Sequence, residues 1–100
     1  MDNQILRIKE NDPNLIFINM DGGGSPIYKY KGNYFTGIVE DYLDCILNYE
    51  AEYENGYLEG WVRFYHPNGD LETVKKLHYN MVVPGTYKRF NEDGNLIHSM

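Results

Sequence analysis

Short hydrophobic runs alternate along the chain with clusters of Gly, Pro, Asn and Asp, which are typical of turns. These clusters fall at 12–14, 21–26, 31–33, 54–56, 66–70 and 92–95. Asn-Gly and Asp-Gly pairs suit tight hairpin turns, because both central residues of a type I′ turn need a positive φ. The intervening runs are rich in Tyr, Val, Ile, Phe and Thr and have the length of strands. This pattern predicts an all-β protein built from antiparallel hairpins.

The first 25 residues differ from the rest. Two apolar runs, 5–8 and 15–18, predict an N-terminal β-hairpin closed by the turn at Asp12-Pro13-Asn14. The glycines at 22–24 then predict a flexible joint. Three glycines also occur in phosphate-binding loops, but no helix start and no Lys-Ser or Lys-Thr follows them here, so that function is not indicated.

Residues 39–53 contain the best helix candidate, since Leu43, Ile46 and Leu47 have helical spacing. The run 45–49 fits a strand equally well, and the repeat described next favours the strand. We therefore expect Cys45 to be a half-buried strand residue.

An internal repeat covers most of the remaining chain. Three segments run from a tyrosine to a glycine: 30–37, 53–60 and 79–85, the last shorter by one residue. An aromatic residue stands five positions beyond each glycine: Tyr42, Tyr65 and Phe90. The glycine is expected to let a neighbouring aromatic ring lie flat against the backbone. Stacking one hairpin per unit predicts a single elongated, twisted sheet.

The segment 53–71, with Tyr-Glu-Asn-Gly-Tyr-Leu-Glu-Gly followed by aromatic residues and Asn-Gly-Asp-Leu, resembles the variant MORN repeat of bacterial YwqK-type antitoxin proteins. The resemblance covers about three repeats within 28–97, so 1–100 is expected to be one domain. The first copy has Lys-Gly-Asn at its turn, and the third replaces Asn-Gly by 81–84. MORN-type repeats serve in antitoxins, immunity proteins, scaffolds and lipid-associated proteins, so the resemblance implies a fold more sharply than a function.

Charge is unevenly distributed. The net charge is −6, and residues 33–62 hold seven acids and no Lys or Arg. Phosphate contacts need Lys and Arg, so nucleic-acid binding is disfavoured and a basic protein partner is favoured. No apolar run is long enough to span a membrane, and a negative chain does not favour anionic lipid.

The acids at 50, 52 and 54 alternate with Tyr49, Ala51 and Tyr53, which places the three carboxylates on one face of a strand. One interpretation is a solvated face balanced by cross-strand bases: Arg63, Lys76 or Lys88. The other is an acidic patch that meets a basic partner. Its predicted partner-binding residues, with two aromatic residues as candidate hot spots, are Asp41, Asp44, Glu50, Glu52, Glu54, Tyr57, Glu59 and Trp61.

Catalysis is not indicated. Paired catalytic acids need a cleft and a fixed separation, the three histidines have no metal-ligand spacing, and Cys45 has no orienting base. We therefore expect no enzymatic activity, no metal and no cofactor. A single cysteine cannot form an internal disulfide, which favours the cytoplasm. The leading hypothesis is an antitoxin or immunity protein that occludes a toxic effector; the alternative is a MORN-like scaffold or membrane-associated module.

Overall fold

The computed structural model describes residues 5–20 and 26–100. These residues form strands and contain no helix, which confirms the predicted all-β fold, and accordingly none of them belongs to a helix that could cross a membrane. The strands are β1 (Arg7–Lys9), β2 (Leu15–Met20), β3 (Pro26–Tyr30), β4 (Asn33–Tyr34), β5 (Gly37–Leu43), β6 (Ile46–Glu54), β7 (Tyr57–Tyr65), β8 (Leu71–His78), β9 (Met81–Val82), β10 (Lys88–Phe90) and β11 (Leu96–Ser99). The predicted glycine joint at 22–24 lies outside the described residues.

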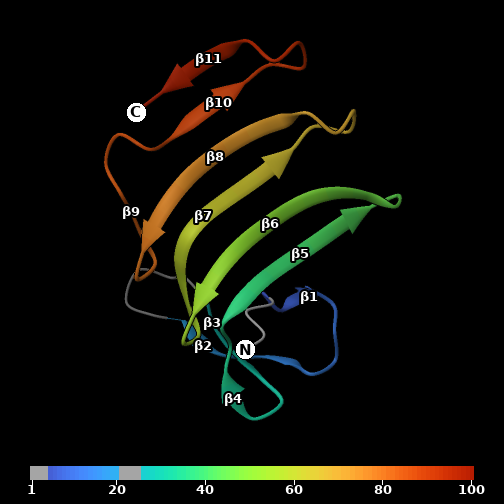
Figure 1. The fold of residues 1–100 in the computed structure, drawn as a ribbon, viewed down its shortest axis with the longest axis vertical. Coiled ribbons are helices and arrows are strands. Elements are labelled where there is room, and N and C mark those ends of the chain that lie inside the picture. The colour runs from blue at the N-terminus through green and yellow to red at the C-terminus, as the bar shows by residue number, and fades with distance from the viewer. Residues whose placement is uncertain (1–4, 21–25) are drawn as a thin grey trace.

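The strands of residues 5–20 and 26–100 form two sheets rather than the predicted one. The large sheet has the order β1-β5-β6-β7-β8-β10-β11, with β9 beside β8, and the small sheet has the order β2-β3-β4. Figure 1 shows the large sheet as a twisted, curved ladder, with β2 and β3 behind the end where β5 begins and β6 ends. We call the side of the large sheet that faces the viewer in Figure 1 the front face, and the opposite side the back face.

Tight turns form where the sequence predicts them. Asn55 and Gly56 have φ values of 50° and 90° and join β6 to β7, as a type I′ turn requires. Lys31 and Gly32, with φ values of 50° and 87°, join β3 to β4 in the same way. The third copy differs, because Tyr79 lies within its turn rather than at the end of a strand. The repeat therefore keeps its hairpins while the tyrosine shifts its place in them.

Strands occupy the segment that also had helical spacing. β5 and β6 are antiparallel and pair Val39 with Ala51, so the preference for a strand is confirmed. Asp44 and Cys45 both have positive φ and form the turn between them. Cys45 is consequently exposed in a turn, and the prediction of a half-buried strand residue is wrong. The run 45–49 contained no glycine to mark this turn, which is why the sequence concealed it.

The predicted N-terminal hairpin does not form. β1 pairs in parallel with β5, whereas β2 pairs with β3 in the small sheet. The turn at 12–14 exists, since the Asp12 N–H bonds the Lys9 carbonyl oxygen at 2.9 Å. A turn signal reports only a local change of direction and not whether the flanking strands pair. Separating the two strands lets Ile8 and Leu15 enter the core from different sheets.

The core lies between the back face of the large sheet and the small sheet. Phe35, Val39 and Ala51 are at most 2% exposed at its centre. Tyr28 of the small sheet meets Tyr53 of β6 edge to face, with ring centroids 5.5 Å apart. Apolar burial of this kind is the main stabilising contribution available to a sheet of this size. It leaves the front face free of a second layer within the described residues.

Candidate binding face

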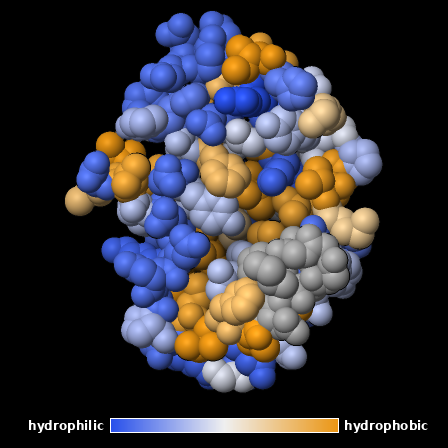
Figure 2. Space-filling view, turned by 180° about the vertical axis from the view of Figure 1, so that it is seen from behind, coloured by the Kyte–Doolittle hydropathy of each residue, from blue (hydrophilic) through white to orange (hydrophobic). Residues whose placement is uncertain are grey.

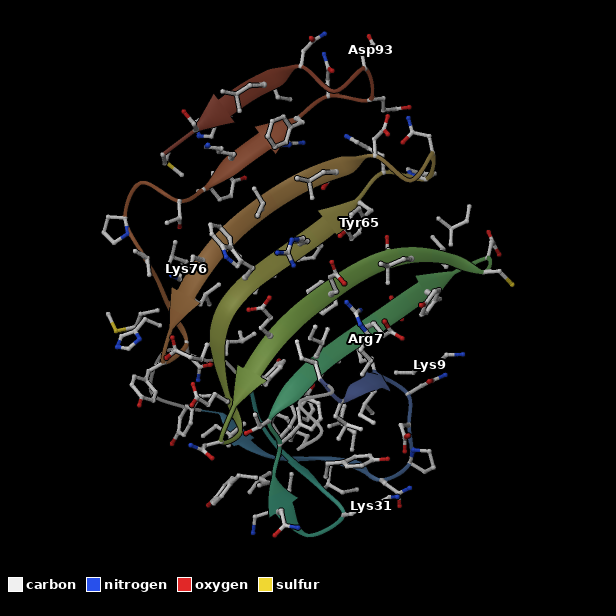
Figure 3. The ribbon with its side chains drawn as sticks, viewed as in Figure 1. Arg7, Lys9, Lys31, Tyr65, Lys76 and Asp93 are labelled. Carbon is white, nitrogen blue, oxygen red and sulfur yellow. The ribbon has the colours of Figure 1, made fainter. Side chains whose placement is uncertain are left out.

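Strand register determines which charged residues share the front face. Glu50 pairs with Glu40 on one side and with Arg63 on the other. Residues directly opposite each other in a sheet point to the same side, so all three lie on the front face. Figure 3 shows Arg7 and Tyr65 on this face as well, on either side of β6. The like charges of Glu40 and Glu50 are therefore placed among cations and a phenol.

Glu50 is the centre of this network. Arg7 Nη1 lies 3.1 Å from Glu50 Oε2 and 3.1 Å from Glu40 Oε2, which bridges the two carboxylates. On the other side, Arg63 Nη1 lies 3.5 Å from Glu50 Oε1, and the Tyr65 hydroxyl donates a hydrogen bond of 2.5 Å to the same oxygen. Glu50 is only 7% exposed. A buried carboxylate this fully partnered is a structural group.

The pKa values around Glu50 follow from these contacts. Burial alone would raise the pKa of Glu50, but the hydrogen bonds from Tyr65 and Arg7 outweigh it, and the pKa is lowered. Burial and the hydrogen bond to Glu50 raise the pKa of Tyr65 to about 12. Glu50 therefore stays ionised and Tyr65 stays protonated at neutral pH.

Glu52 is also occupied within the chain. Its Oε1 accepts a hydrogen bond of 3.1 Å from the Trp61 backbone N–H, and Arg63 Nη1 lies 3.8 Å from Oε2. A side chain at Gly60, where φ is 116°, would collide with the Glu52 carboxylate. The glycine of this repeat thus makes room for a carboxylate, and the predicted aromatic ring against it is wrong for this copy.

Glu54 and Glu59 border a hollow of about 250 Å³ on the front face, together with Glu52. We call it the acidic hollow. Glu54 is exposed and forms no ion pair among the described residues. The Glu59 Oε1 lies 2.9 Å from His78 Nδ1. The hydrogen bond with His78 is the main cause that lowers the pKa of Glu59, so this carboxylate also stays ionised.

The other predicted residues are spread out. Asp41 pairs with the back-face residue Tyr49, and Asp44 lies in the β5–β6 turn. Tyr57 is half-buried and meets Tyr79 edge to face, with centroids 6.1 Å apart. The eight predicted residues therefore do not form one patch: Glu52, Glu54 and Glu59 come together, with Trp61 beside them, whereas Asp41 and Asp44 lie elsewhere.

Trp61 borders a second hollow on the front face. This hollow has a volume of about 330 Å³ and is lined by Trp61, Arg63, Val74, Gly85, Thr86 and Lys88. We call it the cationic hollow. Lys76 stands next to it, with its Nζ 5.9 Å from the centroid of the Trp61 indole, and Figure 3 shows Lys76 on the same face. The two hollows adjoin at Trp61, because Glu52 binds its backbone and Lys76 covers its ring.

Of the three groups that contact Glu50, the sequence predicted Arg63 but did not reveal Arg7 or Tyr65. Arg63 was predicted opposite the carboxylates, and it contacts both Glu50 and Glu52. Arg7 was missed because the alternation along 5–8 does not reveal that its strand pairs with β5. The contact of the Tyr65 hydroxyl with Glu50 was also missed, because it reaches across the β6–β7 pair to a residue whose direct cross-strand partner is Arg63.

Within residues 5–20 and 26–100, no group of three or more His, Cys, Asp or Glu side chains is placed to hold a metal ion. His66 instead donates through Nε2 to the Phe90 carbonyl oxygen at 2.9 Å, and its Nδ1 lies 3.6 Å from Glu72. These contacts fasten β10 to the β7–β8 turn. The histidine thus has a structural use in this part of the chain.

Comparison with known proteins returned nothing: no protein-family model, no curated protein and no solved structure matches the chain.

Proposed function

We propose that this chain is a cytoplasmic antitoxin or immunity protein, which binds a basic toxic effector through the front face and occludes its active or substrate-binding surface. The supporting observation is the acidic hollow beside the half-buried Trp61 on an uncovered sheet face. The resemblance of 53–71 to variant MORN antitoxins supports the same class. In this proposal the chain acts by binding and carries out no chemistry itself.

The charges on the front face give the proposal a specific geometry. Glu50 is held by Arg7, Arg63 and Tyr65, so it stiffens the face and does not reach a partner. Glu54 is exposed, and Glu59, which also lines the acidic hollow, is kept ionised. A Lys or Arg of the effector entering between them would form charge-assisted hydrogen bonds. The net charge of −6 adds steering of a basic partner over longer distances.

Co-expression tests this function. The product of the adjacent gene is expressed alone and together with this chain, and cell growth and co-purification are measured. We expect growth arrest without this chain, rescue with it, and a stable complex. A neighbour that is harmless alone, or that is toxic but neither captured nor neutralised, contradicts the proposal.

Charge reversal at one position tests the acidic hollow within that assay. Glu54→Lys should weaken the complex at least about tenfold, as expected for a carboxylate that meets a cation. Glu92→Lys is the matched control, because Glu92 is an exposed acid in the β10–β11 turn and the change in net charge is the same. Equal affinity of the two variants would remove the acidic hollow from the interface.

A further inference from the structure

We propose that the cationic hollow is a second binding site, which takes a carboxylate side chain from an acidic peptide segment of a protein partner. Arg63 and Lys88 line it, and Lys76 stands beside it. Trp61 and Val74 supply the apolar surface on which the methylene groups of a bound Asp or Glu and its neighbouring residue can pack. Arg and Lys bind carboxylates through charge-assisted hydrogen bonds, and Trp and Arg are enriched at the residues that dominate binding energy.

The charge balance at this hollow favours an anion. Lys76 and Lys88 form no ion pair with the acids of the described residues, and the contacts of Arg63 with Glu50 and Glu52 run through Nη1. The positive charge of Lys76 is also one of the causes that lower the pKa of Glu59, which lines the neighbouring acidic hollow. Three cations thus gather on a chain that is otherwise strongly negative. An acidic group bound there would relieve their mutual repulsion.

The hollow is held in shape by its own hydrogen bonds. The Val83 N–H donates to the Lys76 carbonyl oxygen at 2.8 Å. The Thr86 hydroxyl donates to the Val83 carbonyl oxygen at 2.6 Å and accepts from the Lys76 N–H at 3.1 Å. The loop that links β9 to β10 is therefore fixed against β8 before any ligand arrives. Preorganised sites lose less conformational entropy on binding.

The loop belongs to the third repeat, in the part where this copy departs from the repeat pattern. In the second copy the residues after the tyrosine form the turn and the next long strand, whereas in the third copy residues 81–86 form the two-residue strand β9 and then a wall of the hollow. The irregular copy is thus the one that creates the site. A regular copy would continue the sheet and leave Trp61 without an enclosing loop.

The inference deepens the proposed function, on which it rests only in part. An effector bound to the front face would meet an acidic hollow and a cationic hollow side by side, so a partner with one basic and one acidic group could bind in a single orientation. Opposite charges at neighbouring points suppress wrong partners as well as wrong orientations. The cationic hollow can nevertheless be examined without any effector.

Trp61 is the single tryptophan of the chain and therefore reports on the hollow directly. The probe is the peptide N-acetyl-Gly-Glu-Asp-Glu-Gly-amide, titrated at low ionic strength while Trp61 fluorescence and the amide and indole NMR signals are followed. The neutral counterpart, N-acetyl-Gly-Gln-Asn-Gln-Gly-amide, is titrated in parallel. We expect saturable shifts at Trp61, Val74 and Thr86 with the acidic peptide and none with the neutral one.

Matched lysine variants locate the effect. Lys88→Glu should lower the affinity for the acidic peptide about tenfold or more, and Lys88→Gln should lower it by a smaller factor. Lys75→Glu is the control, because Lys75 pairs with the back-face residue Val62 and the change in net charge is identical. Dispersed NMR spectra verify that each variant is folded.

Three results would overturn the inference: equal binding of both peptides, equal loss in Lys88→Glu and Lys75→Glu, or shifts that avoid Trp61. Inorganic phosphate and a short single-stranded DNA are titrated as well. Binding of either with the Lys88 dependence, in the absence of peptide binding, would replace the acidic peptide by a phosphate ligand. Peptide binding without neutralisation of the neighbouring gene product would retain this site and reject the antitoxin function. Neutralisation of the gene product without peptide binding would retain the antitoxin function and reject this site.

Discussion

The two ends of the large sheet are built from the same hairpins but differ in what covers them. The back of β5, β6 and β7 is covered by the small sheet, and Val39, Ala51 and Val62 are almost fully buried there. At the other end, β11 is exposed along its whole length, and Leu96 and Ile97 are more than half exposed. Figure 2, which views the molecule from behind, shows hydrophobic residues at the middle and along the lower part of this side, whereas hydrophilic residues prevail near the top.

This difference teaches that the hairpin repeat alone does not decide stability. The strands at both ends are joined by the same kind of antiparallel pairing. The second layer comes from β2, which precedes the repeats, and from β3 and the loop that carries Phe35, which belong to the irregular first copy. We therefore expect the side chains of the covered end to contribute most of the free energy of unfolding, and those of the uncovered end to contribute less.

Truncation of one phenylalanine at each end gives the largest expected contrast. Phe35→Ala removes a side chain that is 1% exposed and should lower the free energy of unfolding by about 4 kcal/mol. Phe90→Ala removes a half-buried ring from β10 and should cost about 1 to 2 kcal/mol. Urea denaturation, followed by circular dichroism, measures both. Equal losses would show that the second layer does not control stability.

Glycine substitution should give a smaller contrast. At Gly37, where φ is 151°, a Cβ would collide with the Leu6 carbonyl oxygen, which itself accepts a 2.8 Å hydrogen bond from the Ile38 N–H. Gly37→Ala should thus displace β1 and cost about 3 kcal/mol. Gly94→Ala meets no atom within 4 Å and should cost only the strain of a positive φ, about 1 kcal/mol. Thermal unfolding of the two variants compares them, and a milder effect at Gly37 would contradict the close contact with β1.

The pH dependence of stability provides the finest contrast. Because the folded-state pKa of Glu50 is lowered, its stabilising effect is complete above the unfolded value of roughly 4.3 and is lost as pH falls through the folded pKa. Glu50→Gln should cost about 2 kcal/mol at pH 7 and progressively less below roughly pH 4. Glu92→Gln, in the uncovered end, should leave the curve unchanged. Urea midpoints measured from acid to neutral pH decide the matter; identical curves for the Glu50 variant and the wild type would exclude this network as a source of acid sensitivity.

The sequence predicted the local parts of this structure and failed for the long-range ones. The turn at Asn55-Gly56 and the strand over 46–54 follow from turn chemistry and from alternation. The partner of β1 could not be predicted in this way, because a strand of three residues pairs with the sheet edge that remains open after the rest has folded. The same holds for the second sheet, whose strands carry no signal of their destination.

The candidate site shows the same difference between features that the local sequence predicts and features that depend on long-range structure. Glu52, Glu54 and Glu59 were predicted from charge, and register brings them together around one hollow. Asp41 was included on charge alone, but alternation along β5 places it with Tyr49 on the other side. The cationic hollow could not be predicted, since it depends on a loop whose sequence departs from the repeat.

The parallel pairing of β1 with β5 has a consequence for the time course of folding. Arg7 and Glu40 are 33 residues apart in the chain, whereas β5, β6 and β7 follow one another through two-residue turns. Closing a short hairpin costs less chain entropy than closing a long loop, so the consecutive hairpins can assemble before β1 finds its place. On a ribosome, β1 emerges before β5 and has no edge of β5 to join until that strand has been synthesised. β1 is thus made before its partner strand but is fixed after it, and Arg7 is the residue by which β1 completes the charge network of the front face.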